Sequence, residues 1–188
     1  MRTDLGWQAL EWPGTEHVIA GVTGDGFRAE GRLVLADGGL ASVCYTLDCD
    51  QDWQFRQLSV VQDAAPGRRT LKLTCDADGQ WAADGSPRPD LTGCTDIDIS
   101  RTPLTNTLPI RRLAWRAGEP RDLAVVYVRL PELTADRVRQ RYTLLSRDAS
   151  GAAVYRYESG SFRADLPADP DGFVTNYPGL WQRLETGR

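Results

Sequence analysis

The sequence predicts a mainly β protein built on a single curved antiparallel sheet, a half-barrel or open barrel with few short helices. Three observations lead to this prediction. Apolar and polar residues alternate with period two along much of the chain, turn-forming residues separate the alternating segments, and almost no segment has the apolar period of a helix. A twisted open sheet of nine or more strands rarely stays flat, so we expect it to curl and create a concave face.

The first half of the chain predicts a meander of neighbouring strands. In GFRAEGRLVLA, residues 26–36, apolar or small residues alternate with Arg28, Glu30 and Arg32. A DGG turn at 37–39 leads into a second alternating segment at 41–47, so we expect a hairpin. The meander continues through WQFRQLSVV (53–61) and RTLKLTC (69–75).

The second half begins with a break in this pattern. Residues 76–93 are rich in turn formers and predict a long, exposed connection around Trp81. RDLAVVYVRL (121–130) is apolar on both faces, as expected of a central, covered strand. VRQRYTLLSR, AAVYRYES and SFRADL then return to alternation and resume the meander. The stretch 134–141 also fits a helical turn capped by Thr134, but we favour a strand there.

Composition and charge limit the class of protein. With no repeat and no linker-like tract, we expect one domain covering residues 1–188. The formal net charge of −4 gives no general attraction to nucleic acid, so we expect no nucleic-acid partner. The chain shows no secretion signal and no run of about 18 apolar residues. We therefore expect a cytoplasmic protein without membrane insertion.

The cysteines and the histidine give no metal or cofactor signature. Four cysteines are present without a Cys-x-x-Cys pair, and His17 is the one histidine. Zinc, haem and Cys/His nucleophilic sites therefore lack the side chains they need, and we expect no cofactor and free thiols.

The basic residues on the predicted strands have two interpretations. Interleaved Glu30, Glu158 and Asp165 favour a solvated face with cross-strand ion pairs. The alternative is a surface for anionic lipids or polyanions. The basic residues concerned are Arg32, Arg56, Lys72, Arg139, Arg141, Arg156 and Arg163.

The segment CTDIDISRTPLTNTLPIRRL, residues 94–113, concentrates polar groups. In an extended CTDIDI, Asp96 and Asp98 lie on one face about 7 Å apart, with Ile97 and Ile99 on the other. Two carboxylates at this spacing can act as acid and base on a sugar or phosphate substrate. They can equally lie on a solvated edge or pair with neighbouring arginines, and we favour the structural interpretation.

The rest of this segment predicts one helical turn followed by a second extended stretch. Thr102 is the expected N-cap, and Pro109 is expected to end the turn by holding its predecessor extended. Arg111 and Arg112 then point to opposite faces, so one can pair with an aspartate while the other faces ligand or solvent. Thr102 and Asn106 can bond backbone groups or sugar hydroxyls.

The C-terminal FVTNYPGLWQRL predicts a turn at Pro178 and Gly179 between Tyr177 and Trp181. The two aromatic rings either close the end of a sheet or stack on the face of a sugar. We favour closure of the sheet.

Two motifs, GCTDIDISRTPLTNTLPIRRL and NYPGLWQR, resemble the bacterial family called putative glycolipid-binding proteins, formerly a domain of unknown function. The early VCYTLDCDQDWQFR also fits. The resemblance implies an antiparallel half-barrel similar to bacterial lipoprotein and lipid carriers, with an apolar cavity on its concave side and no catalytic residues. The ligand-binding positions carried over are Asp96, Asp98, Thr102, Asn106, Arg111, Arg112, Tyr177 and Trp181.

The leading functional hypothesis is a protein that holds a lipid or glycolipid, with acyl chains in the concave sheet and the head group near the Asp/Arg motif. One alternative is a hydrolase-type enzyme that uses Asp96 and Asp98 on a sugar or phosphate substrate. Another is a cytoplasmic scaffold that offers a sheet edge to a partner. The sequence leaves the oligomeric state open.

Overall fold

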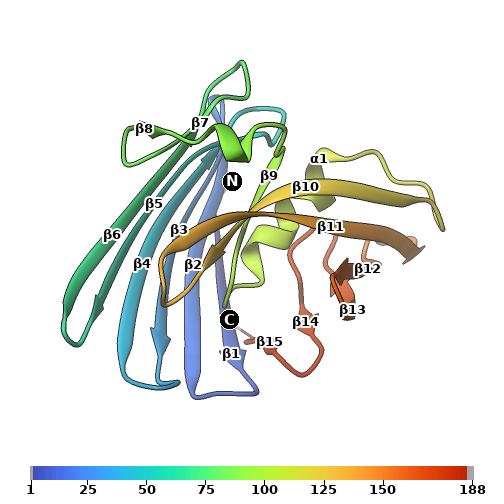
Figure 1. Ribbon diagram of the computed structural model, residues 1–188. Helices are drawn as coiled ribbons and strands as arrows, with labels where there is room; N and C mark the ends of the chain where they lie inside the picture. The colour runs from blue at the N-terminus through green and yellow to red at the C-terminus, as the bar shows by residue number, and fades with distance from the viewer. Residues whose placement is uncertain (1, 186–188) are drawn as a thin grey trace.

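The computed structural model describes residues 2–185, which form two β-sheets (Figure 1). The larger sheet has ten strands and is antiparallel throughout. Its spatial order is β14 (Asn176–Tyr177), β15 (Trp181–Arg183), β1 (Arg2–Ala9), β2 (Gly14–Thr23), β3 (Gly26–Leu35), β4 (Ala41–Cys49), β5 (Phe55–Ala64), β6 (Gly67–Cys75), β7 (Trp81–Ala83) and β8 (Ser86–Pro87).

The smaller sheet has five strands and lies on the concave side of the larger one (Figure 1). Its spatial order is β13 (Phe162–Ala168), β12 (Ala153–Ser159), β11 (Thr134–Arg147), β10 (Pro120–Arg129) and β9 (Asp96–Ile99). The prediction of a mainly β protein with a large antiparallel sheet that does not close into a barrel is confirmed. A single sheet was predicted from the sequence, whereas strands β9 to β13 form a second sheet.

The alternating segments form the strands that the sequence predicted. Along β3, buried and exposed residues alternate from Phe27 to Leu35. The strand at 134–141 is also confirmed, since these residues begin β11. In β10 the neighbours Val125 and Val126 are both buried, as expected for a strand between β11 and β9 with both faces covered.

The connection at 76–93 is more ordered than predicted. It carries β7 and β8, which extend the larger sheet, and a short 3-10 helix, η1 (Pro89–Leu91). Trp81 is 3% exposed and stacks on Phe55 with 4.9 Å between ring centroids. The turn formers bend the chain, but burial of the indole holds this segment against the core.

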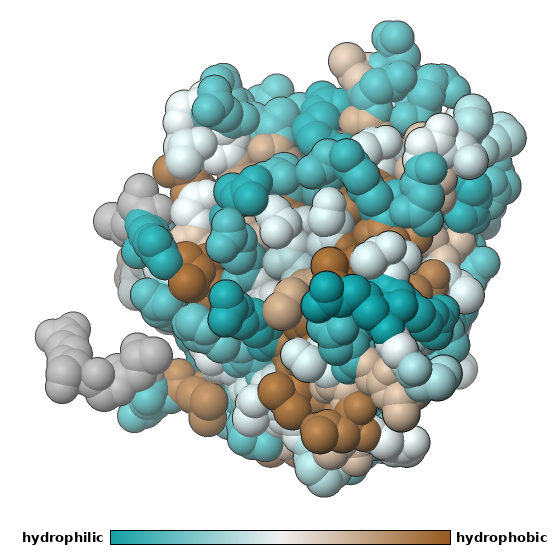
Figure 2. Space-filling model, turned by 90° about the vertical axis from the view of Figure 1, so that its left-hand side faces the viewer, coloured by the Kyte–Doolittle hydropathy of each residue, from teal (hydrophilic) through white to brown (hydrophobic). Residues whose placement is uncertain are grey.

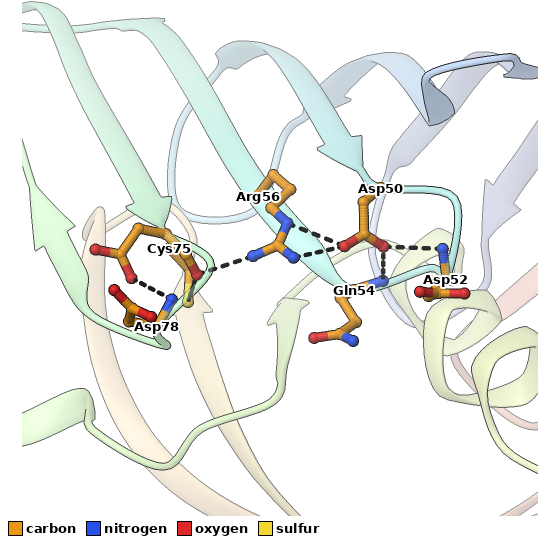
Figure 3. A network of polar contacts seen from close by, with 7 residues as sticks. Asp50, Asp52, Gln54, Arg56, Cys75 and Asp78 are labelled. Atoms are coloured by element: carbon orange, nitrogen blue, oxygen red, sulfur yellow. Dashed lines mark hydrogen bonds and ion pairs between the residues drawn. The ribbon is translucent and has the colours of Figure 1, made fainter.

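The turn before β5 shows the structural role of the acidic DCDQD segment (Figure 3). Asp50 Oδ1 accepts the backbone N–H groups of Asp52 (2.9 Å) and Gln54 (3.0 Å), while Asp50 Oδ2 accepts Arg56 Nη2–H at 2.6 Å. Arg56 also donates to the carbonyl of Asp76 at 2.8 Å. Burial acts to raise the pKa of Asp50, but these hydrogen bonds outweigh burial and lower the pKa. The β4–β5 and β6–β7 turns are thus joined by one guanidinium.

The segment after β9 is helical, which corrects the prediction of a second extended stretch. A 3-10 helix, η2 (Leu104–Asn106), leads directly into α1 (Thr107–Arg112), so Leu108 is helical. Pro109 is the third residue of α1, where an amide has no acceptor within its own helix, so proline does not interrupt it. η2, α1 and the residues that follow them form the crossover connection that parallel strands need, and β9 and β10 pair in parallel.

Buried side chains of both sheets, η2 and α1 form one hydrophobic cluster that includes Leu33, Leu58, Ile97, Leu104 and Val126. The resemblance implied an apolar cavity enclosed by the concave side. In the described residues, core side chains of the smaller sheet and of η2 pack against those of the larger sheet. The open pockets described below lie at the ends of the strands.

Three further observations concern the sequence-based expectations. The domain predicted for residues 1–188 includes residues 1 and 186–188, which lie outside the described range. Within that range no helix is long and apolar enough to cross a membrane. The four cysteines carry free thiols, as expected.

Two of the basic residues of the smaller sheet, Arg141 and Arg156, form cross-strand ion pairs, as expected of a solvated face. Arg141 Nε lies 2.7 Å from Asp122 Oδ1, and Arg156 Nε lies 2.8 Å from Asp165 Oδ1. Both pairs join neighbouring strands across the outer face of the sheet.

Candidate functional site

A pocket of about 480 Å³ opens at the end of the molecule where the β1–β2 and β14–β15 turns lie side by side (Figure 1). Its walls come from these two turns, from β9 and the residues after it, and from β10, β11 and the β12–β13 hairpin. We call it the aromatic pocket after six of its lining side chains, Trp12, Tyr127, Tyr157, Phe162, Tyr177 and Trp181.

Five of the aromatic side chains contact one another in two groups, Tyr157 with Phe162 and Tyr177, and Trp12 with Trp181. Tyr157 contacts Phe162 and Tyr177, with ring centroids 6.0 Å and 6.2 Å apart, and Trp12 meets Trp181 edge to face at 5.7 Å. The predicted turn at Pro178–Gly179 is confirmed, since Gly179 has φ of +75° and Leu180 N–H bonds the Tyr177 carbonyl. Tyr177 and Trp181 therefore close the sheet and also face the pocket.

Asp98 is a buried carboxyl group in the wall of this pocket. Its Oδ1 accepts the Thr105 hydroxyl and its Oδ2 accepts the Gln140 amide, each at 2.7 Å. Burial raises the pKa of Asp98, although the hydrogen bonds from Thr105 and Gln140 oppose that shift. The group is therefore easier to keep protonated than an ordinary aspartate.

Thr102 joins the site to the larger sheet through a second buried carboxyl group. Its hydroxyl donates to Glu16 Oε2 at 2.7 Å, and the Tyr45 hydroxyl donates to Glu16 Oε1 at 2.8 Å. Tyr45 reaches Glu16 by crossing β3 over Gly31, where a Cβ would lie 2.1 Å from the tyrosine ring. Burial raises the pKa of Glu16 to about 8, despite opposing hydrogen bonds from Thr102 and Tyr45.

Asn106 is buried in η2 and bonds protein groups at both ends of its amide. Its Nδ2 donates to the Pro103 carbonyl at 3.2 Å, and its Oδ1 accepts the Tyr142 hydroxyl at 2.9 Å. Asn106 lines the pocket, but these contacts give it mainly a structural role in fixing η2 against β11.

Asp96 and Arg112 pair with each other, in agreement with the structural interpretation of this motif. Arg112 Nη2 lies 2.5 Å from Asp96 Oδ2, and the Thr95 hydroxyl donates to the same oxygen at 2.7 Å. Asp96 is 2% exposed, so the arginine compensates a buried carboxylate. Neither residue lines the aromatic pocket, so Asp96 and Asp98 do not face one site.

Arg111 contacts a different region. Its guanidinium carbon lies 5.1 Å from the centroid of the Trp53 ring, which itself stacks on Phe27 at 4.4 Å. Both aromatic residues line a small pocket of about 100 Å³ that does not share residues with the aromatic pocket. In α1 the two neighbouring arginines point in different directions, Arg111 to Trp53 and Arg112 to Asp96.

The eight residues predicted to bind ligand thus fall into two groups. The aromatic pocket is lined by Asp98, Thr102, Asn106, Tyr177 and Trp181. Outside it lie Asp96, Arg111 and Arg112.

Several lining residues were not found from the sequence. Trp12 and Arg101 face each other, with the guanidinium carbon 4.1 Å from the indole centroid. Tyr127 and Tyr157 were interpreted only as strand residues. Tyr127 pairs with Asp98 across β10 and β9, and Tyr157 pairs with Tyr142 across β12 and β11. A local sequence pattern does not contain such long-range pairing. Glu16 does not line the pocket but accepts a hydrogen bond from Thr102, which does.

The arrangement suits a ligand with both apolar and hydroxyl-bearing surfaces. Aromatic faces can pack on apolar faces of a ring, while Asp98, Ser100 and the Arg129 guanidinium at the rim offer hydrogen bonds. Among residues 2–185 no cluster of three His, Cys, Asp or Glu side chains is arranged to hold a metal ion.

Comparison with known proteins gives two matches over most of the chain. The family described as Putative glycolipid-binding matches residues 4–183. A crystal structure of a DUF1089 family protein from Pseudomonas aeruginosa is 38% identical, with a TM-score of 0.79. That match covers 90% of this chain and 92% of the other. The comparison with curated proteins finds no match.

Proposed function

Because the chain belongs to the Putative glycolipid-binding family, as its motifs predicted, we propose that it binds an amphiphile whose sugar head group occupies the aromatic pocket. The observation that carries this proposal is the lining of that pocket, which includes six aromatic side chains and a buried carboxyl group. A sugar ring offers apolar C–H faces and hydroxyl edges, and this lining complements both.

The polar groups of the pocket differ in how free they are to meet a ligand. Thr102 and Asn106 already bond Glu16, Tyr142 and the Pro103 carbonyl, so they support the wall rather than recognise the head group. Asp98 accepts hydrogen bonds from Thr105 and Gln140 and also has a side-chain hydrogen bond with Tyr157. Its two carboxylate oxygens offer about four lone-pair sites, so the group retains some acceptor capacity. Asp98 is therefore the expected partner of a sugar hydroxyl.

The first experiment is native mass spectrometry of the protein as purified, followed by titration with n-octyl glucoside and with free glucose. We expect a co-purified amphiphile or saturable binding of octyl glucoside, and weaker binding of glucose, because each buried methylene contributes about 0.8 kcal/mol. If the protein carries no amphiphile and no alkyl glucoside binds, the proposal is wrong.

A pair of variants locates the binding. Phe162 is 41% exposed at the pocket rim, so Phe162→Ala should leave the core intact. Loss of its ring contact should weaken octyl glucoside binding about tenfold, from about 1.4 kcal/mol of lost packing. The control is Val34→Ala, an apolar residue of similar exposure on β3 outside the pocket. Equal binding by both variants would place the ligand elsewhere.

A further inference from the structure

A second pocket, of about 360 Å³, adjoins the aromatic pocket and is lined differently. The β3–β4 turn, the end of β5 and the β10–β11 turn form its walls. We call it the aliphatic pocket after Leu35, Leu40, Ala41, Ala64, Ala65 and Pro131. Figure 2 shows apolar side chains gathered at the lower end of one face, the end at which the β3–β4 and β5–β6 turns lie in Figure 1.

Arg101 lies at the boundary of the two pockets and lines both. Its guanidinium Nη2 is 2.8 Å from Asp37 Oδ2, which belongs to the aliphatic pocket. On the other side its Cζ lies 4.1 Å from the ring centroid of Trp12, which belongs to the aromatic pocket. One side chain therefore lies between the aromatic pocket and the aliphatic pocket, whose lining also includes Asp37, Gln62, Arg69 and Glu132.

The backbone at this position favours a functional role for the arginine side chain. Arg101 has φ of +69°, in the left-handed region where glycine is the unstrained residue. A side chain is nevertheless present, and its partner Asp37 is half exposed on a turn that contains two positive-φ glycines. An exposed ion pair of this kind contributes little to stability, so a ligand anion can replace the aspartate.

Leu40 supports an apolar occupant for the second pocket. It is 73% exposed, the most exposed of the large apolar side chains in the described part of the chain, and it lies in the wall of the aliphatic pocket. Exposure of this apolar surface to water is unfavourable, and an acyl chain in the pocket would cover part of it.

From this geometry, and resting on the proposed function, we infer that the two pockets hold one anionic glycolipid. The sugar lies in the aromatic pocket, the acyl chain lies in the aliphatic pocket, and an anionic group between them replaces Asp37 at the Arg101 guanidinium. An anionic linking group at a guanidinium forms charge-assisted hydrogen bonds that a neutral linker lacks.

The chain-length arm of the test uses octyl, decyl and dodecyl glucosides. Affinity should rise about fourfold with each added methylene until the aliphatic pocket is full. Leu40→Ser should reduce this gain per methylene at least twofold, whereas Leu10→Ser, an exposed leucine outside both pockets, should leave it unchanged. An unchanged gain in Leu40→Ser would overturn the assignment of the acyl chain.

The charge arm compares decyl phosphate with decyl glucoside. Arg101→Gln should weaken phosphate binding about tenfold or more, and Asp37→Asn should strengthen it several-fold by removing the competing carboxylate. Stronger binding cannot arise from misfolding, so Asp37→Asn guards against a damaged variant. If neither change alters phosphate affinity, the anionic site is wrong while the proposed function stands. If no alkyl glucoside binds the wild type, both fail.

Discussion

At the scale of single residues, two buried carboxyl groups mark the site. Glu16 and Asp98 are each held by hydroxyl or amide donors, and burial raises the pKa of both. Asp96, in contrast, is compensated by a guanidinium. The pKa of Glu16, which burial raises to about 8, makes the stability of the fold depend on pH.

Glu16→Gln should remove part of that pH dependence. The folded chain holds the Glu16 proton up to about pH 8, whereas the ordinary pKa is 4.5, so the folded state binds more protons in this window. The stability from this group is complete below pH 4.5 and is lost as pH rises through about 8, by about 1.4 kcal/mol per pH unit. Melting temperatures of wild type and variant across this range measure the difference.

The control for this experiment is Glu30→Gln, at an exposed position of the neighbouring strand β3. Its stability relative to wild type should change little over the same pH range. If the Glu16→Gln difference from wild type is also independent of pH, the buried carboxyl is not protonated in the folded protein.

At the scale of elements, the close crossing of Tyr45 over β3 explains a glycine within a strand. Gly31→Ala would place a Cβ 2.1 Å from the Tyr45 ring, which is buried and held by Glu16. We expect a loss of about 3 kcal/mol in the free energy of unfolding, measured by urea denaturation. Gly24→Ala is the control, because no atom lies within 4 Å of its added Cβ. Equal stability of the two variants would contradict this packing.

The elements also show what the sequence could and could not predict. Strands β3 to β6 and β11 to β13 follow from alternation of apolar and polar residues, as the burial pattern of β3 illustrates. β10 follows instead from its continuous apolar run, because both of its faces are covered. β1 and β2 were not predicted. Leu5, Gly6 and Trp7 are buried in succession because Leu184 also covers the outer face, and Glu16 occupies a core position. Both features break the simple pattern.

For residues 94–113 the ion pair between an aspartate and an arginine was predicted correctly, whereas the extended backbone after the first helical turn was predicted wrongly. Pairing of an arginine with Asp96 follows from charge and proximity alone. The helical conformation of α1 depended on η2 preceding Pro109, which placed the proline in the first turn of α1 rather than in its interior. Residues such as Trp12 and Tyr157 reach the site through long-range pairing, which a local pattern does not contain.

At the scale of the whole molecule, the two sheets share one hydrophobic cluster. Unfolding should therefore be a single cooperative transition in urea. Trp115 contacts Tyr142 and Tyr155 of the smaller sheet, with ring centroids 6.5 Å and 5.1 Å apart, whereas Trp7 is buried in the larger sheet. For the wild type, and separately for Trp115→Phe, the urea midpoint measured by tryptophan fluorescence should coincide with the midpoint measured by far-UV circular dichroism. Separate midpoints would mean that the sheets unfold independently.

The order of strands in the larger sheet has a consequence for biosynthesis. The first strand, β1, pairs with β15, and the Trp7 indole donates to the Val174 carbonyl at 2.9 Å, across a separation of 167 residues. Contacts of such high contact order form late and slow the folding rate. A nascent chain on the ribosome consequently holds one edge of β1 and the Trp7 indole without their native partners until residues 174–183 emerge. Chaperone capture during translation is expected to act on that edge.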